Sequence, residues 1–291
     1  MTRHYYRSVL ATLVVALLCG FAAPVFAQAP ADDDDAKLRP LEPDFKITNL
    51  PTTLPMPVHG GAFELTHRFG GDFANTDFGT LAGNLFGLDN GATINLGYRF
   101  GLMKHLEVAV SRTQAFKEIQ FQAKYDAFHE DQGKPVGLSA ILSIEGDNNF
   151  GACSDCVTER SPAIGLSISR TLGSAAVVYV DPFWVHNSAG TGAPTVGTRD
   201  TGFVGLGTRV RLVPATFVTF EVSPRVGGYA PGTAMYAVAI EKRVGGHVFS
   251  LNFGNSTLGS TYGQIARGGS SAVPNGHMPL YMGFNLSRKF Y

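Results

Sequence analysis

One short stretch of the chain has a spacing that could support nucleophilic catalysis. His186 and Ser188 stand two residues apart, and residues i and i+2 of a β-strand lie on the same face. A histidine beside a serine can take the hydroxyl proton and activate the oxygen for attack on an ester, and Asp200 is a candidate for the residue that orients the histidine. A match of two residues is common by chance, so the spacing alone favours polar residues at the start of a loop.

Two cysteines, Cys153 and Cys156, stand three residues apart in a polar segment. In an oxidising compartment such a pair most simply forms a local disulfide bond that pins a loop. Haem attachment would need a histidine after the second cysteine, where the chain has Val157, and a zinc site would need two further ligands nearby. We therefore predict a disulfide bond, no metal site and no cofactor.

A larger set of charged residues recurs at alternate positions of extended segments. By parity these residues share one face with Gly, Ser and Thr, whereas the opposite face is apolar. The charges expected on the polar face are Glu64, Arg68, Arg99, Glu107, Glu118, Lys124, Asp126, Glu145, Asp181, Arg209, Arg211, Glu221, Arg225, Glu241, Arg243 and Lys289. Acids and bases balance, which leaves open weakly selective rings around a passage for solutes or paired clusters that brace the protein.

The segments that carry these charges alternate in twos, the period of a strand with two different faces. In one of them Ile94, Leu96 and Tyr98 alternate with Asn95 and Gly97. Twelve segments follow this pattern, at about 59–69, 91–101, 104–113, 116–127, 135–146, 161–171, 174–186, 200–212, 215–226, 233–244, 247–254 and 280–290.

The connections between the segments alternate between short turns and long loops, with one short exception near residues 113–115. This layout is typical of antiparallel barrels in bacterial outer membranes. Arg or Lys facing lipid at the bilayer midplane would cost ~2–4 kcal/mol each, so the charged face must line the lumen. The sequence therefore predicts an all-β fold, an antiparallel transmembrane β-barrel of about 12 strands over residues 59–291, with both termini on the periplasmic side.

The residues before the barrel divide into two parts. Residues 1–27 have a basic start, a short apolar run and small residues before Ala27, as in a cleaved secretory signal peptide. Residues 28–58 contain four consecutive aspartates followed by five closely spaced prolines. This composition predicts a solvated periplasmic tail, because a calcium loop would need spaced ligands and a glycine turn.

The overall composition excludes two classes of protein. The 23 Lys and Arg residues balance the 23 Asp and Glu residues, which argues against a nucleic-acid binder that relies on phosphate neutralisation. The hydrophobic fraction of 44% is too high for a disordered chain. The expected partners are outer-membrane lipid and small solutes, and the sequence leaves the oligomeric state open.

Several short motifs resemble those of one known family. They are Leu54–Pro57, Phe63–Phe69, Glu145–Phe150, Glu221–Arg225, Ile240–His247 and Gly283–Phe290. Together they resemble an uncharacterised family of bacterial membrane-bound β-barrel domains, over the chain from about residue 50 to the end. The resemblance implies a barrel fold and a membrane location, and it carries no substrate, cofactor or active-site residue.

Separately, His186 and Ser188 resemble the catalytic pair of outer-membrane phospholipase A, although Ala189 and Gly190 stand where that family has Asn-Gly. We expect instead a non-enzymatic barrel that is a narrow, weakly selective channel or a structural membrane component. Twelve strands fall between small closed barrels and open porins, and the loop 255–279 can fold inward and narrow the lumen further. The alternatives are the lipid hydrolase and a surface receptor or adhesin that acts through its long loops.

Overall fold

The computed structural model of the protein describes residues 41–89, 91–151, 160–188, 196–230, 233–274 and 276–290. The expected signal peptide, residues 28–40 of the expected tail, and both cysteines of the expected disulfide bond, Cys153 and Cys156, lie outside the described residues.

The described residues form strands joined by connections that contain short helices and 3-10 turns. The strands are β1 (Gly61–Asp72), β2 (Ala92–Met103), β3 (Leu106–Thr113), β4 (Ile119–Phe128), β5 (Gly137–Gly146), β6 (Ser161–Leu172), β7 (Ala176–Val185), β8 (Val196–Val213), β9 (Thr216–Ser223), β10 (Arg225–Ala230), β11 (Met235–Val244), β12 (His247–Gly254) and β13 (Tyr281–Phe290). The connections contain α3 (Phe78–Gly83), η1 (Leu85–Gly87), η2 (Ala115–Lys117), η3 (Glu130–Gln132), η4 (Asp147–Phe150) and α4 (Tyr262–Arg267). None of the helices in this part of the chain is long and apolar enough to cross a membrane.

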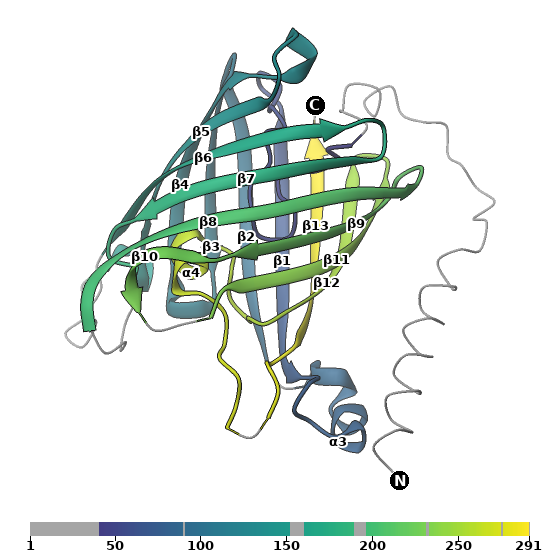
Figure 1. Ribbon diagram of the computed structural model, residues 1–291, viewed down its shortest axis with the longest axis vertical. Helices are drawn as coiled ribbons and strands as arrows, with labels where there is room; N and C mark the ends of the chain where they lie inside the picture. Colours follow the sequence, from purple (N-terminus) through teal and green to yellow (C-terminus); the bar gives the residue numbers. More distant parts are fainter. Residues whose placement is uncertain are drawn as a thin grey trace.

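The strands form one closed antiparallel sheet (Figure 1). Sequential strands pair from β1 to β9 and from β11 to β13, and β1 also pairs with β13. β8 pairs with both β9 and β10, and β9 pairs with β11. Pro224 separates β9 from β10, and proline has no N–H to continue a ladder, so these two strands are one interrupted strand. The predicted antiparallel barrel of twelve strands is therefore confirmed.

The two ends of the barrel differ as the spacing of the segments predicts. We call the end with the connections 104–105, 129–136, 173–175, 214–215 and 245–246 the turn end. We call the opposite end, with the connections 73–91, 114–118, 147–160, 186–195, 231–234 and 255–280, the loop end. The C-terminus lies at the turn end, at the top of Figure 1, and α3 lies below the loop end.

The outer face of the barrel is apolar along the strands. Leu142, Ile164 and Phe121 are each more than half exposed although they are large apolar side chains. An apolar outer face of this kind is compatible with lipid as the surrounding medium.

Residues 41–58 differ from the solvated tail that their composition predicts. Residues 41–56 lie inside the barrel, where Phe45, Ile47, Leu50 and Leu54 are buried, and residues 57–58 are exposed. The residues between the prolines include these apolar side chains, and their burial against the strands stabilises a segment that has no regular hydrophobic period. Residues 41–56 are therefore part of the interior of the barrel.

The interior also has an apolar wall that the charge pattern does not predict. The inward side chains of β7 include Val177, Tyr179, Phe183 and Val185, and all four are buried. They belong to one apolar cluster that also contains residues of the 41–58 segment and of α4. One side of the lumen thus resembles the core of a soluble protein.

Candidate functional site

The lumen is the candidate functional site, because the structure directs the predicted charges into it. Most are buried on inward positions of the strands or, for Glu118, directly before β4: Arg68, Arg99, Glu107, Glu118, Lys124, Asp126, Glu145, Asp181, Arg209, Glu221, Glu241 and Lys289. Glu64, Arg211, Arg225 and Arg243 are partly exposed.

The wall charges form close ion pairs. Arg99 Nη1 lies 2.9 Å from Glu107 Oε1, and Lys124 Nζ lies 3.4 Å from the other oxygen of that carboxylate. On the opposite side of the lumen, Arg209 Nε lies 2.7 Å from Glu241 Oε2. The pairs of Glu107 connect neighbouring strands, and the pair of Arg209 with Glu241 connects β8 to β11 across β9.

Residues 45–52 fold into a hairpin inside the lumen, which we call the plug hairpin. Its arms are joined by hydrogen bonds from Thr52 N–H to Phe45 O (3.0 Å) and from Ile47 N–H to Leu50 O (2.8 Å). The chain then returns to the turn end, where His59 N–H donates to Gly101 O before β1 begins. The plug hairpin is therefore inserted from the turn end, with its tip deep in the barrel.

One carboxylate holds the tip of the plug hairpin. Glu221 Oε2 accepts hydrogen bonds from the backbone N–H groups of Thr48 (3.2 Å), Asn49 (2.9 Å) and Leu50 (3.2 Å). The Asn49 side-chain amide donates to the other oxygen of Glu221, and its own oxygen accepts from Arg68 Nη2 at 3.0 Å. Three successive N–H groups converging on one anion satisfy donors that would otherwise be buried without partners.

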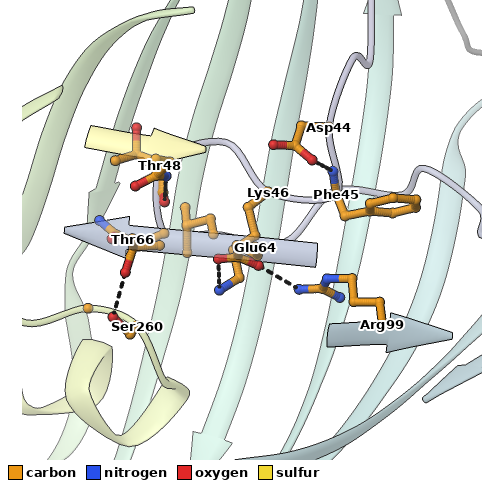
Figure 2. A network of polar contacts seen from close by, with 12 residues as sticks. Asp44, Phe45, Lys46, Thr48, Glu64, Thr66, Arg99 and Ser260 are labelled. Atoms are coloured by element: carbon orange, nitrogen blue, oxygen red, sulfur yellow. Dashed lines mark hydrogen bonds and ion pairs between the residues drawn. The ribbon is translucent and has the colours of Figure 1, made fainter. Parts of the chain in front are cut away.

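The arm of the plug hairpin is held by charge on a second wall. Lys46 Nζ lies 2.7 Å from Glu64 Oε1, and the Arg99 guanidinium lies 3.7 Å from the other oxygen of that carboxylate (Figure 2). Beside them, three cations surround the ring of Phe45: Arg99 at 5.9 Å, Lys124 at 5.8 Å and Lys289 at 6.0 Å from its centroid. Each distance is within the range of a cation–π interaction.

Glycines on β8 make room for the apolar side of the plug hairpin. A Cβ atom at Gly207 would lie 2.3 Å from Ile47 Cδ1, and one at Gly205 would lie 2.5 Å from Leu50 Cδ2. Both distances are far below van der Waals contact, so the hairpin can pack here only because these inward positions have no side chain.

The connection 255–280 enters the lumen from the loop end through α4. Thr261 caps the helix by accepting from Gln264 N–H, and the Tyr262 ring stacks on Phe183 at 4.3 Å. Burial raises the pKa of the Tyr262 phenol well above its usual range, so the hydroxyl stays protonated. It donates to Gln122 Oε1 at 3.0 Å.

Arg267 at the end of α4 fixes the helix to the wall. Its Nη2 lies 2.7 Å from Glu118 Oε1, and its guanidinium lies 5.0 Å from the centroid of the Phe116 ring. Its Nε donates to Ser188 O at 2.9 Å, and Gln264 Nε2 donates to Glu118 Oε2 at 2.5 Å. The sequence allowed the loop 255–279 to fold inward, and the structure places α4 of this loop inside the lumen.

The two inserted segments lie close to the wall. Ser260, just before α4, lies with its hydroxyl oxygen 3.2 Å from that of Thr66 on β1 (Figure 2). A cavity lined by Lys46, Glu64 and Arg99, among others, has a volume of about 20 Å³, room for about one water molecule. In the described part of the chain, the plug hairpin and α4 fill the centre of the lumen.

The predicted catalytic spacing is wrong in one respect, because His186 and Ser188 do not share a face. β7 ends at Val185, and Asn187 has a φ of 54°, so the alternation of a strand stops before Ser188. The His186 ring is exposed, with Nδ1 2.7 Å from Asp200 Oδ1, the residue suggested by the sequence as its orienting partner. Ser188 is fully buried, and its Oγ lies 2.6 Å from Thr201 Oγ1.

The remaining sequence-based site predictions concern metals and the cysteines. The described residues contain no group of three His, Cys, Asp or Glu side chains placed to hold a metal ion. The cysteine pair stays a prediction, since it lies outside the described residues.

Sequence reasoning missed the residues of the plug hairpin as parts of the site. The sequence does contain a signal for burial of this segment. Its prolines predict a solvated tail, but it also contains five apolar residues, Phe45, Ile47, Leu50, Leu54 and Met56. A solvated linker has no need of them.

Comparison with known proteins bears on the fold. A family model described as membrane bound beta barrel domain (DUF5777) matches residues 44–290, a range that includes the whole plug hairpin. Among solved structures, the COG4313 outer membrane channel from Pseudomonas putida F1 is similar with a TM-score of 0.49 and 12% identity, over 81% of this chain and 97% of that one. A triple-mutant porin of Rhodopseudomonas blastica has a TM-score of 0.34 and 11% identity, over 68% of this chain and 55% of the porin. No curated protein matches the sequence.

Proposed function

Because this chain belongs to the family of membrane-bound β-barrel domains, as its motifs predict, we propose that it is an outer-membrane channel in its closed state. The plug hairpin closes the lumen, and displacement of the hairpin toward the turn end opens it. The solutes that pass are small and of either charge, because the acids and bases on the inward face of the strands balance, buried and partly exposed residues together.

The observation that carries the proposal is the chemistry of the wall behind the plug hairpin. The tip and one arm contact Glu221, Arg68 and Glu64 on the strands, through hydrogen bonds and ion pairs. Water can replace such contacts when the hairpin leaves, because ions and amides are well solvated. A plug held only by apolar packing would expose an apolar surface on leaving, at a cost of about 25 cal/mol per Å².

The sequence pattern supports the location and partners that we propose for this channel. The alternation of short turns and long loops supports the outer membrane, with export by the signal peptide of residues 1–27 and with the turn end toward the periplasm. Outer-membrane lipid surrounds the barrel, and small solutes are its cargo. The separation of His186 from Ser188 supports a barrel without hydrolase activity.

The experiment compares the full chain with a variant whose plug hairpin cannot fill the lumen. Residues 45–52 are replaced by a Gly/Ser segment of equal length, and both proteins are reconstituted in planar bilayers. We expect the variant to give a steady conductance and the unchanged protein to give brief openings between long closed periods. Gel migration with and without boiling establishes that the variant is folded; a folded variant that never conducts would leave the barrel a structural membrane component.

A further inference from the structure

The connection between β1 and β2 presents an apolar surface that the barrel does not cover. We call residues 73–88, which contain α3 and η1, the α3 loop. Four large apolar side chains of this loop, Phe78, Leu85, Phe86 and Leu88, are 41–56% exposed. The loop has one charged residue, Asp77, and its carboxylate accepts from Thr80 N–H as the cap of α3.

Ring contacts connect this surface to the outer face of the barrel. Phe253 lies on the outer face of β12, and its ring is 6.0 Å from that of Phe73 at the start of the α3 loop. The Phe73 ring lies 6.4 Å from that of Phe86, and the Phe86 ring lies 6.1 Å from that of Phe78. The exposed side chains of the loop therefore continue the apolar wall that faces lipid.

The backbone provides an independent observation. Leu85 has a φ of 45° and Phe86 has a φ of 56°, a left-handed conformation that disfavours residues with large side chains. Both side chains are exposed, so burial within this chain does not offset the strain. Strain that the protein does not compensate internally is a sign of a functional constraint.

The same arrangement recurs at another loop of this end. Phe150 has a φ of 60°, and its ring lies 6.0 Å from that of Phe121, which is exposed on the outer face of β4. Loop aromatics beside outward strand aromatics are the composition of an interfacial girdle.

We infer that the α3 loop is a membrane-interface anchor, whose side chains Leu85, Phe86 and Leu88 insert among lipids at the loop end of the barrel. The occupant of the apolar surface is the lipid layer itself, because the surface is continuous with the lipid-facing wall and the loop is almost uncharged. Interfacial Phe and Leu side chains with few charges bind lipid through buried apolar area.

Fluorescence quenching by lipid tests this assignment on the full chain. The chain has a single tryptophan, Trp184, exposed on the outer face, which serves as the positive control. In a Trp184→Phe background, Phe86→Trp and Leu88→Trp are the reporters, and the matched control is Ala272→Trp, at an exposed position of the 255–280 connection. Leu88 has an ordinary helical φ of −60°, so this second reporter remains informative if Phe86→Trp disturbs the strained turn.

Each protein is reconstituted in vesicles of phosphatidylcholine with or without bromine atoms on the acyl chains. Both reporters should lose fluorescence roughly two-fold in brominated vesicles, as expected for side chains about 5–10 Å into the interface, with a blue-shifted emission. Ala272→Trp should be unaffected by bromine and quenched by aqueous iodide. Reporters that behave like Ala272→Trp would overturn the inference. Blue-shifted reporters that bromine does not quench would also overturn it, since a protein partner or second copy then covers the loop.

Discussion

Replacing Glu221 by glutamine should weaken the binding of the tip of the plug hairpin to the barrel wall and raise the fraction of open channels. In the closed state one oxygen of Glu221 accepts from the N–H groups of Thr48, Asn49 and Leu50. An amide oxygen in the same place loses the ionic part of three hydrogen bonds, about 1 kcal/mol each, because bonds to charged groups contribute about 1.5–3 kcal/mol and neutral ones about 0.5–1.5. The new NH₂ group faces the Asn49 amide that donated to the carboxylate, while Arg68 engages the Asn49 oxygen.

Part of this loss is offset, because an amide is less costly to bury than a carboxylate. We therefore expect the closed state to be destabilised by about 2–3 kcal/mol, and a factor of ten corresponds to about 1.4 kcal/mol. The ratio of open to closed channels should rise roughly 30- to 150-fold.

The assay is the open probability of single channels in planar bilayers. The matched control is Glu107→Gln, which removes a carboxylate of similar burial whose ion pairs go to Arg99 and Lys124 on the strands. An equal rise in both variants would mean that any loss of luminal charge loosens the barrel. A different result is that the barrel opens when residues 45–52 are replaced and yet shows no rise in open probability with Glu221→Gln. That result would refute the assignment of Glu221 as the residue that holds the tip.

Three further outcomes are expected. Gly207→Ala should displace the plug hairpin and raise the open probability, because overpacking against Ile47 destabilises the closed state by about 1–3 kcal/mol. Gly202→Ala on the same strand should leave the open probability unchanged, because its added Cβ atom would have its nearest contact at 3.5 Å. Equal open probabilities of the two variants would contradict the packing argument. Arg267→Met removes the ion-pair partner of the buried Glu118 carboxylate, which should destabilise the position of α4 by about 3–5 kcal/mol. Amide hydrogen exchange of residues 260–268 should therefore accelerate, and unchanged exchange would show that the ion pair does not hold α4. Ser188→Ala and the unchanged protein should release fatty acid from phospholipid at the same background rate, and a loss confined to the variant would reinstate the hydrolase.

The strands could be predicted from sequence because each has two different surroundings. Ile94, Leu96 and Tyr98 alternate with Asn95 and Gly97, and an apolar outside with a polar inside imposes that period on every strand. The plug hairpin has no such period, because its side chains point toward several walls at once. Its burial depends on contacts with residues far away in the chain, such as Glu221, and local pattern carries no information on these.

β7 shows why the apolar wall was missed. Val177, Tyr179, Phe183 and Val185 alternate with further apolar residues, so the segment is almost continuously apolar. Such a run is typical of a strand buried on both faces, here by lipid outside and by α4 inside. The placement of Ser188 was missed for a local reason, since the left-handed residue Asn187 ends the alternation.

Closure of the lumen by the plug hairpin can be tested by fixing the hairpin in place and releasing it during one recording. The hydroxyl oxygens of Thr48, at the tip, and Thr219, on β9, lie 3.4 Å apart, so the double variant Thr48→Cys/Thr219→Cys can form a disulfide bond across this contact. The native Cys153 and Cys156 are replaced by serine, and a variant with Thr219→Cys alone is the control. If the plug hairpin must move for solutes to pass, no openings should occur while the bond is intact, and openings should return on the same bilayer after a reductant is added. Equal conductance before and after reduction would contradict this requirement, because solutes would then cross the barrel without movement of the hairpin.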